Sequence, residues 1–332
     1  MLFRSGLTRI KRNAANAPRI DRTMLPAYIT HPDCLKHEMG PNHPECPERL
    51  GAINDHLLIR GLLDMMLPYD APLATEEQLA RAHTLLHVRE LASLAPEAGY
   101  VHVDPDTCMN PHTWQAALRS AGAAVLATDL VLSGKAPTAF CSVRPPGHHA
   151  TRGAAMGFCF FNNVAVGIRH ALDVHGLERV ALIDFDVHHG NGSEDILAGD
   201  ARVLMCGTFQ KELYPFNGEE ALGANMLNVG LPPYARGDSF RAAVETHWLP
   251  ALDAFAPQLI YISAGFDAHR EDEMASLGLV EADYEWVTRR LVEVAEKHCQ
   301  GRIVSCLEGG YSLGSLARSV AAHVRVLTGA AG

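Results

Sequence analysis

The chain has 332 residues, of which 48% are hydrophobic and 20% charged, and its formal net charge at pH 7 is −10. This length suffices for one large α/β domain or two small ones. The acidic balance argues against a general nucleic-acid binder, which would carry a basic face, and no apolar run has the length of a membrane span. We therefore expect no direct nucleic-acid or membrane partner. The acidity is compatible with cationic substrates, but it equally fits the ordinary solubilising excess of an enzyme.

The eight cysteines are scattered and form no C-x-x-C pair. Several of them lie in apolar, strand-like runs, where a free thiol packs as a small hydrophobe. Because the chain also shows no secretory signal at its start, we expect a reducing cytoplasm. Residues 1–23 carry six basic side chains against the single acid Asp21, which is typical of an organelle transit peptide. The favoured interpretation is a disordered basic arm, or Met24 as the true start, followed by a single domain over residues 24–332.

Taken in order, the chain alternates between strand-like and helix-like segments. Strands are expected at residues 27–30, 138–143, 180–183, 202–206, 225–229, 259–263 and 302–307. Helices are expected at residues 48–63, 76–95, 112–132, 162–175, 239–255, 281–298 and 313–327. Between 31 and 49 lies a segment rich in His, Pro, Glu and Cys; the irregular spacing of His37, His43 and Cys46 favours a rigid surface loop over a metal site. Repeated strand-then-helix units predict a parallel sheet covered on both faces.

The central strand-like run, residues 180–183, stops at an unusual polar cluster that includes Asp184, Asp186 and His188. In an extended backbone these alternate residues point the same way. Asp186 and His188 are then able to bind one metal ion, with Asp184 one step behind as support. Carboxylate oxygen together with imidazole nitrogen suits zinc. The alternative is a strand end with solvated charges, followed by the first turn of a helix.

Three other expected strands also end in polar residues. The runs are Arg144-Pro-Pro-Gly-His-His149, Ala264-Gly-Phe-Asp267 and Glu308-Gly-Gly-Tyr311. The carboxyl ends of the strands in an open parallel sheet share one edge, and ligands bind there. We therefore expect residues that are distant in sequence to converge on one pocket.

These motifs support a resemblance to a known family. R-P-P-G-H-H-A (144–150), G-F-C-F-F-N-N (157–163), D-F-D-V-H-H-G-N-G (184–192), A-G-F-D-A-H (264–269) and L-E-G-G-Y (307–311) are similar to motifs of the zinc-dependent histone deacetylase superfamily. That superfamily includes acetylpolyamine amidohydrolases and acetoin-utilisation proteins. The resemblance runs from Tyr28 to the C-terminus, and Asn191 places the chain nearer to the class II branch. It implies an arginase-like, three-layer α/β/α domain whose eight-stranded, mostly parallel sheet carries the active site at the carboxyl ends of its strands.

The resemblance also implies a metal centre and a base. The zinc ligands would be Asp186, His188 and Asp267, and the ion would activate a water and polarise the substrate carbonyl. His149 matches the family's general base and acid, and we expect its pKa to lie near the natural value of histidine. His148 matches the orienting and electrostatic partner of that base.

Further roles follow from the same resemblance. Asp184 would accept a hydrogen bond from His148, and Asn191 one from His149. Tyr311 would donate its hydroxyl to the oxyanion that forms during the reaction, on the side opposite the zinc. A buried tyrosine with a satisfied hydroxyl is the alternative interpretation of Tyr311.

A narrow acyl-lysine channel is also implied. Phe158 matches one wall, Tyr214 falls where the other wall is expected, and Gly157 would support the channel from behind. Asp106 aligns with a rim acid that holds a substrate backbone amide in some relatives, although a plain turn former fits it as well. The alignment around residues 209–217 is loose.

Two positions depart from the family's pattern. The serine that helps to bind a structural potassium near Asp184 corresponds to Gly207, so that K⁺ site is weakened. Relatives specialised for polyamines carry a glutamate where this chain has Met274, which favours acyl-lysine over acetylpolyamine substrates. The acidic run 271–273 before it is interpreted as a solvated loop rather than as an amine-recognition site.

The sequence therefore predicts a zinc-dependent deacetylase that acts on acyl-lysine peptides or proteins, with acetylated amines as the alternative substrates. An arginase-type two-metal ureohydrolase is disfavoured, since Gly190 and His269 stand where further carboxylate ligands would be needed. A non-catalytic acyl-lysine reader is a third hypothesis, which turnover would exclude. A homo-oligomer is compatible with the sequence.

Overall fold

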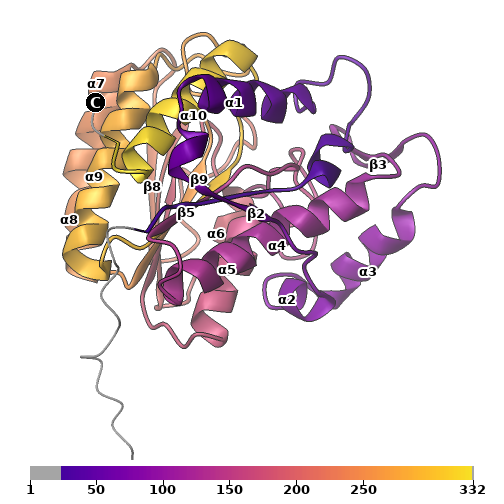
Figure 1. Ribbon diagram of the computed structural model, residues 1–332, viewed down its shortest axis with the longest axis horizontal. Coiled ribbons are helices and arrows are strands. Elements are labelled where there is room, and N and C mark those ends of the chain that lie inside the picture. Colours follow the sequence, from indigo (N-terminus) through magenta and orange to yellow (C-terminus); the bar gives the residue numbers. More distant parts are fainter. Residues whose placement is uncertain (1–23, 331–332) are drawn as a thin grey trace, which may run out of the picture.

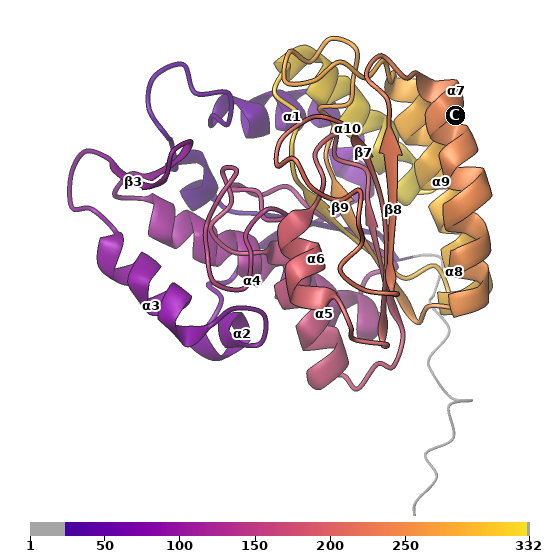
Figure 2. The same ribbon diagram turned by 180° about the vertical axis from the view of Figure 1, so that it is seen from behind.

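The computed structural model describes residues 24–330, and the basic arm expected at 1–23 lies outside them. One eight-stranded sheet, in the order β2-β1-β5-β10-β9-β6-β7-β8, forms the middle of the molecule, and its neighbouring strands are all parallel (Figures 1 and 2). Its strands are β1 (Ala27–Thr30), β2 (Leu67–Asp70), β5 (Thr138–Cys141), β6 (Val180–Asp184), β7 (Val203–Gln210), β8 (Met226–Leu231), β9 (Leu259–Ala264) and β10 (Ile303–Leu307). The expected parallel sheet is confirmed.

Helices cover both faces of this sheet. One face carries α1 (Glu48–Ile59), α7 (Gly237–Ala243), α8 (Leu249–Phe255), α9 (Glu281–Cys299) and α10 (Leu313–Leu327). The other carries α4 (Thr113–Leu132), α5 (Asn163–Asp173) and α6 (Asn191–Leu197), with α2 (Glu76–Ala80) and α3 (Leu85–Leu94) beside them (Figure 2). None of the helices within residues 24–330 is both long and apolar enough to span a membrane.

The central strands form the core. Every residue of β6, β9 and β10 is buried, as expected for parallel strands with a helix layer on each face. The packing is close: a Cβ on Gly167 of α5 would lie 2.3 Å from the hydroxyl oxygen of Tyr261 on β9. Helix and sheet therefore approach here to a distance that only glycine allows.

Several boundaries differ from those expected. The single helix predicted at 76–95 is two helices, each N-capped by a threonine, Thr75 or Thr84. The amide of Thr84 donates to the carbonyl of Arg152, so a tertiary contact interrupts a segment whose local pattern favours one helix. Strand β2 was not predicted, because Pro68 and its mostly exposed side chains carry no strand signal; an edge strand tolerates both features. A hairpin of β3 (Val101–Asp104) and β4 (Thr107–Met109) was not predicted, and Asp106 lies in its turn.

The prediction that residues 31–49 form a surface loop is wrong for its central part. His37 and Glu45 are completely buried, with His37 Nε2 3.3 Å from Glu45 Oε2 and His37 Nδ1 2.8 Å from Thr113 Oγ1. A segment rich in polar residues resembles a surface loop in the sequence. Only the fold shows that Glu45 is neutralised by Arg144.

Candidate active site

The four strands that carry the polar motifs lie side by side in the order β5-β10-β9-β6. Their carboxyl ends therefore bring four distant segments to one edge of the sheet. The side chains gathered there include His148 and His149 after β5, Tyr311 after β10, Asp267 after β9, and Asp186 and His188 after β6.

A buried group of two carboxylates and one imidazole lies at this edge. Ligand atoms of Asp186, His188 and Asp267 lie within 4.8 Å of one another. His188 Nδ1 is 3.0 Å from Asp186 Oδ1 and 3.1 Å from Asp267 Oδ2. Asp267 Oδ1 accepts from the Val187 amide, whereas the buried Oδ2 lies near His188 Nδ1 but forms no hydrogen bond with the described residues. Because a buried carboxylate oxygen needs a donor or a cation, this residue set fits a divalent metal ion.

Two glycines allow the backbone to close over these carboxylates. A Cβ on Gly265 would lie 2.0 Å from Asp186 Oδ2, and one on Gly309 would lie 2.2 Å from Asp267 Oδ2. The Gly309 amide also donates to Asp186 Oδ2 at 2.8 Å. Both positions therefore require glycine, because the backbone passes too close to the carboxylates of Asp186 and Asp267 for any side chain.

The ligands come together by a route other than the one expected from strand alternation. Strand β6 ends at Asp184, and the next residues leave the sheet. Asp184 Oδ1 accepts from the Asp186 amide at 3.1 Å, and Asp186 Oδ1 accepts from the His188 amide at 2.9 Å. Each carboxylate therefore accepts a hydrogen bond from the backbone amide two residues later, and this stabilises a turn of the chain.

The two tandem histidines have different partners. His148 Nδ1 lies 3.1 Å from Asp184 Oδ2, and His149 Nδ1 lies 2.7 Å from Asn191 Oδ1. An amide oxygen only accepts, so His149 carries its proton on Nδ1 and its Nε2 is the free base.

Their electrostatic environments separate them further. Burial lowers the pKa of His149 well below the ordinary 6.5, and the neighbouring His148 and His188 lower it further. Burial acts in the same direction on His148, but Asp186 and Asp184 outweigh it and raise the pKa of His148 well above 6.5. A neutral imidazole therefore lies beside a charged one, in contrast to the near-natural pKa expected for His149.

Tyr311 lies at the same edge, and its surroundings orient it. The centroid of the Tyr311 ring is 5.9 Å from the centroid of the Phe158 ring. The guanidinium of Arg49 lies 4.9 Å from the Tyr311 ring centroid. The Tyr311 amide donates to Asp272 Oδ2 at 2.6 Å. Burial raises the pKa of the phenol well above 10, against the opposing effect of Arg49. Tyr311 is therefore a protonated donor at neutral pH.

Aromatic rings flank the site where a channel is expected. The ring of Tyr214 lies 5.2 Å from that of His149, and a Cβ on Gly157 would touch both rings. Phe158, with a φ of +68°, is held by a hydrogen bond from its amide to Thr107 Oγ1 and packs edge-on against His43 at 4.6 Å.

The remaining rim residues lie nearby. Asp106 is exposed at the turn of the β3–β4 hairpin. The pKa of Tyr214 is raised chiefly because Tyr214 is buried, and the negative charge of Asp106 raises it further. Met274 is partly buried, and its amide donates to Asp272 Oδ1. Gly207 pairs with Asp184 across β6 and β7 and offers no side chain to a cation.

Comparison with known proteins agrees with this geometry. Residues 43–327 match the family described as histone deacetylase domain. The chain belongs to the histone deacetylase family. It is 38% identical over 301 residues to a probable deacetylase of Archaeoglobus fulgidus, covering 87% of this chain and 82% of that one. It is 37% identical over 314 residues to a histone deacetylase-like amidohydrolase of Pseudomonas aeruginosa, with the same coverage.

Two further likenesses extend the comparison. A mouse polyamine deacetylase, HDAC10, is 37% identical over 330 residues, which cover 91% of this chain and 48% of that protein. The crystal structure of the HDA15 HD domain superposes with a TM-score of 0.87 at 32% identity, covering 92% of this chain and 89% of that one. The arginase-like α/β/α fold expected from the resemblance is thereby confirmed.

Sequence reasoning assigned no role to several buried charged residues beneath this histone deacetylase-like site. Glu308 Oε2 accepts from the amides of Gly147 and His148, and burial raises its pKa to about 7. Arg49 Nε donates to the Gly310 carbonyl at 2.6 Å, next to Tyr311. The available signal was position: Glu308 directly follows a mostly apolar strand, β10.

Glu45 belongs to the same set of buried charged residues beneath the site. Its carboxylate pairs with Arg144 and with Arg49 Nη1 at 3.1 Å, and all three side chains are completely buried. Glu45 and Arg49 are four residues apart, but Arg144 lies 99 residues from Glu45, so the spacing does not predict the triad.

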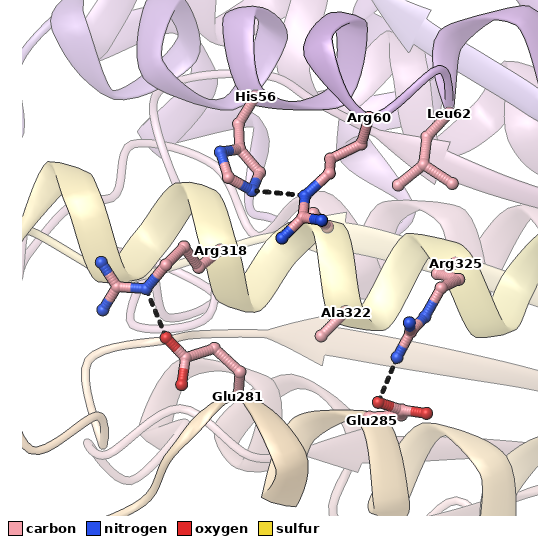
Figure 3. Close-up of a pocket in the computed structure, with 9 residues that line it drawn as sticks. His56, Arg60, Leu62, Glu281, Glu285, Arg318, Ala322 and Arg325 are labelled. Atoms are coloured by element: carbon pink, nitrogen blue, oxygen red, sulfur yellow. Dashed lines mark hydrogen bonds and ion pairs between the residues drawn. The ribbon is translucent and has the colours of Figure 1, made fainter. Parts of the chain in front are cut away.

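The interpretation of residues 271–273 as a solvated loop is wrong for Asp272. Asp272 is buried and accepts from the amides of Tyr311 and Ser312, while Glu271 pairs with Arg318 at 2.7 Å. Arg318 also lines a separate cavity of about 410 Å³ among α1, α9 and α10, where Arg318 pairs with Glu281, and Arg325 pairs with Glu285 (Figure 3). That cavity contains none of the motif residues.

Proposed function

We propose that this protein is a zinc-dependent deacetylase that removes acetyl or related acyl groups from lysine side chains. The observation that carries the proposal is the placement of a neutral His149 beside the buried Asp186–His188–Asp267 group at one sheet edge. Family membership supports the deacetylase activity. The three residues would hold the ion, and bound zinc would supply a Lewis acid for the acyl carbonyl and an acidified water.

The protein's own groups would then perform the proton transfers. His149 Nε2 would take a proton from the attacking water, because its other nitrogen is already committed to Asn191. His148, charged and paired with Asp184, would favour the negative charge that develops nearby. Tyr311 would donate its hydroxyl to the oxyanion, and His149 would deliver its proton to the leaving amine.

The substrate proposal rests on the channel and its rim. The rings of Phe158 and Tyr214 suit a slim methylene chain whose charge has been neutralised by acylation. Polyamine-specific relatives carry a glutamate where this chain has the apolar Met274, and the nearby Asp272 and Glu271 already have partners. Acyl-lysine is therefore favoured, and acetylpolyamine is the second candidate because a polyamine deacetylase is among the relatives.

The deciding experiment measures kcat/KM for acetyl-lysine peptides, N-acetylputrescine, N-acetylspermidine and short acyl-amines, each with and without a zinc chelator. We expect preference for peptides and loss of turnover with the chelator. The matched variant Met274→Glu should shift the preference toward the polyamines. Preference of the unaltered protein for acetylpolyamines would overturn the substrate ranking, and absence of any turnover with zinc bound would favour an acyl-lysine reader.

Other properties remain proposals of the same kind. We propose a reducing compartment, the cytoplasm, because all eight cysteines are free and seven of them are buried. A structural K⁺ near Asp184 would have to rely on backbone oxygens, since Gly207 supplies none from a side chain. A single domain over residues 24–332, with acyl-lysine protein or acetylated amine as partner, completes the proposal.

A further inference from the structure

A second group of potential metal ligands lies at the opposite edge of the sheet. Asp129 of α4, His170 of α5 and His175 in the turn after α5 place ligand atoms within 4.8 Å of one another. Helices α4 and α5 lead into β5 and β6, so their carboxyl ends lie at the amino ends of the strands. The active site occupies the other ends of those strands.

The two imidazoles converge on a single oxygen atom. His170 Nε2 is 2.9 Å and His175 Nε2 is 2.6 Å from Asp129 Oδ1, and the two rings lie 5.1 Å apart. In a tetrahedral zinc site, with bonds of about 2.0–2.2 Å, ligand atoms lie roughly 3.3 Å apart. The corresponding contacts in the candidate active site, 3.0 and 3.1 Å, are similarly shorter than this spacing. A small rotation of the half-exposed Asp129 side chain would lengthen its contacts with His170 and His175 to the spacing that a bound zinc ion needs.

The charges around Asp129 favour a cation. Asp129 and His170 lie in the last turns of their helices, where the helix dipole is negative and a carboxylate is disfavoured. Within residues 24–330, no lysine or arginine forms an ion pair with Asp129, and its partners are the two histidines. Elsewhere on the surface, Asp253 also contacts a histidine, His298, but Lys297 supplies the positive charge.

The scaffold that carries the ligands is firm. Helices α4 and α5 pack against each other, and His170 is buried. The turn with His175 is closed by hydrogen bonds from the amides of Val174 and His175 to the carbonyl of His170. Only Asp129 and His175 are accessible, so an ion would enter from solvent and keep open positions for water.

We propose that Asp129, His170 and His175 form a second divalent-metal site, suited to Zn²⁺ or a similar borderline cation. Two imidazoles and one carboxylate are the donor set that such ions prefer. The bound ion would connect the carboxyl end of α5 to α4. It is separate from the proposed catalytic ion and does not depend on the proposed reaction.

The test is zinc stoichiometry on tag-free, full-length protein. Metal-free protein is titrated with Zn²⁺ against a chromophoric chelator, and bound zinc is confirmed by elemental analysis. We expect two equivalents for the unaltered chain, one for His175→Ala, one for Asp267→Asn and none for the double variant. His298→Ala removes a comparable surface histidine beside an aspartate and should retain both equivalents.

Activity and stability give independent readouts. His175→Ala should keep the kcat/KM of the unaltered protein, which shows that it is folded and separates this site from the proposed function. In the Asp267→Asn background, added Zn²⁺ should raise Tm, and the additional change His175→Ala should abolish that shift. A zinc stoichiometry that His175→Ala leaves unchanged would overturn the proposal. A single equivalent that is lost in His175→Ala and retained in Asp267→Asn would instead support this site and contradict the proposed catalytic one.

Discussion

Two groups of aspartate and histidine occupy opposite edges of one sheet, and they differ in how the chain supports them. Asp186, His188 and Asp267 are buried, and backbone amides and glycines surround their carboxylates. Asp129 and His175 are partly exposed at helix ends, and among the described residues Asp129 Oδ1 accepts only from imidazoles. We infer that the inner group is preorganised for chemistry with a shielded substrate, whereas the outer group would only hold an ion. Burial and support, more than ligand type, separate a catalytic centre from a binding site.

The largest expected contrast is between matched ligand substitutions in the two groups. Asp267→Asn should reduce deacetylation to background, because it removes the charge that completes the inner ligand set. Asp129→Asn removes the same charge from the outer group and should leave kcat/KM unchanged. Steady-state kinetics on both variants decides this, and equal losses would show that the two edges are coupled.

Tyr311→Phe should lower kcat by about 10²–10³-fold, the usual cost of losing one oxyanion donor. KM should change little, because the ring and its contact with Phe158 are retained. The measurement is kcat and KM on the preferred peptide, with zinc content as the control for an intact site. A loss mainly in KM would assign Tyr311 to the channel wall instead.

The buried support beneath the inner group should have a large effect on stability. Glu45→Gln leaves two buried guanidiniums, those of Arg144 and Arg49, without their counterion. Breaking a buried ion pair costs about 3–5 kcal/mol, which denaturant unfolding can measure. Glu76→Gln breaks an exposed pair with Arg89 and should leave the denaturation midpoint unchanged. If both variants are equally stable, the buried triad is not a structural support.

The smallest expected effect is a shift of pH dependence. His149 must be neutral to act as a base, and its pKa lies below 6.5, so kcat/KM should fall only as pH drops below that value. The substitution Asn191→Asp places a negative charge beside the Nδ1–H group of His149 and so raises the pKa of His149. The acid limb of the kcat/KM profile should therefore move to higher pH. An acid limb above pH 6.5 in the unaltered protein would contradict the neutral state of His149.

The alternating pattern and the motifs at strand ends were sufficient to predict the parallel sheet and its functional edge. Asp186 and His188 were predicted as metal ligands because chemically distinctive side chains follow an apolar strand, and Asp267 was added by the family resemblance. The position of Tyr214 was predicted from a loose alignment, and the structure places its ring against His149. Strand β2 was missed because an edge strand needs no apolar run.

The remaining features depend on contacts between distant segments. Glu45, Arg144 and Arg49 are ordinary charged residues in the sequence, and they become a buried triad only when Arg144, which follows β5, meets Glu45 and Arg49 near the start of α1. Asp272 belongs to an acidic run that resembles a solvated loop, yet it accepts the amide of Tyr311. Asp129, His170 and His175 share no motif, and the packing of α4 on α5 alone brings them together.

The amino-acid sequence by itself determined the fold class and predicted the functional edge and the inner ligand set, because strand periodicity and local motifs are short-range properties. Only the tertiary structure decided which charges are buried, which carboxylates are satisfied and how far the two tandem histidines differ in pKa. These quantities depend on desolvation and on partners that lie far away in sequence. The outer metal-ligand group likewise exists only once two helices have packed.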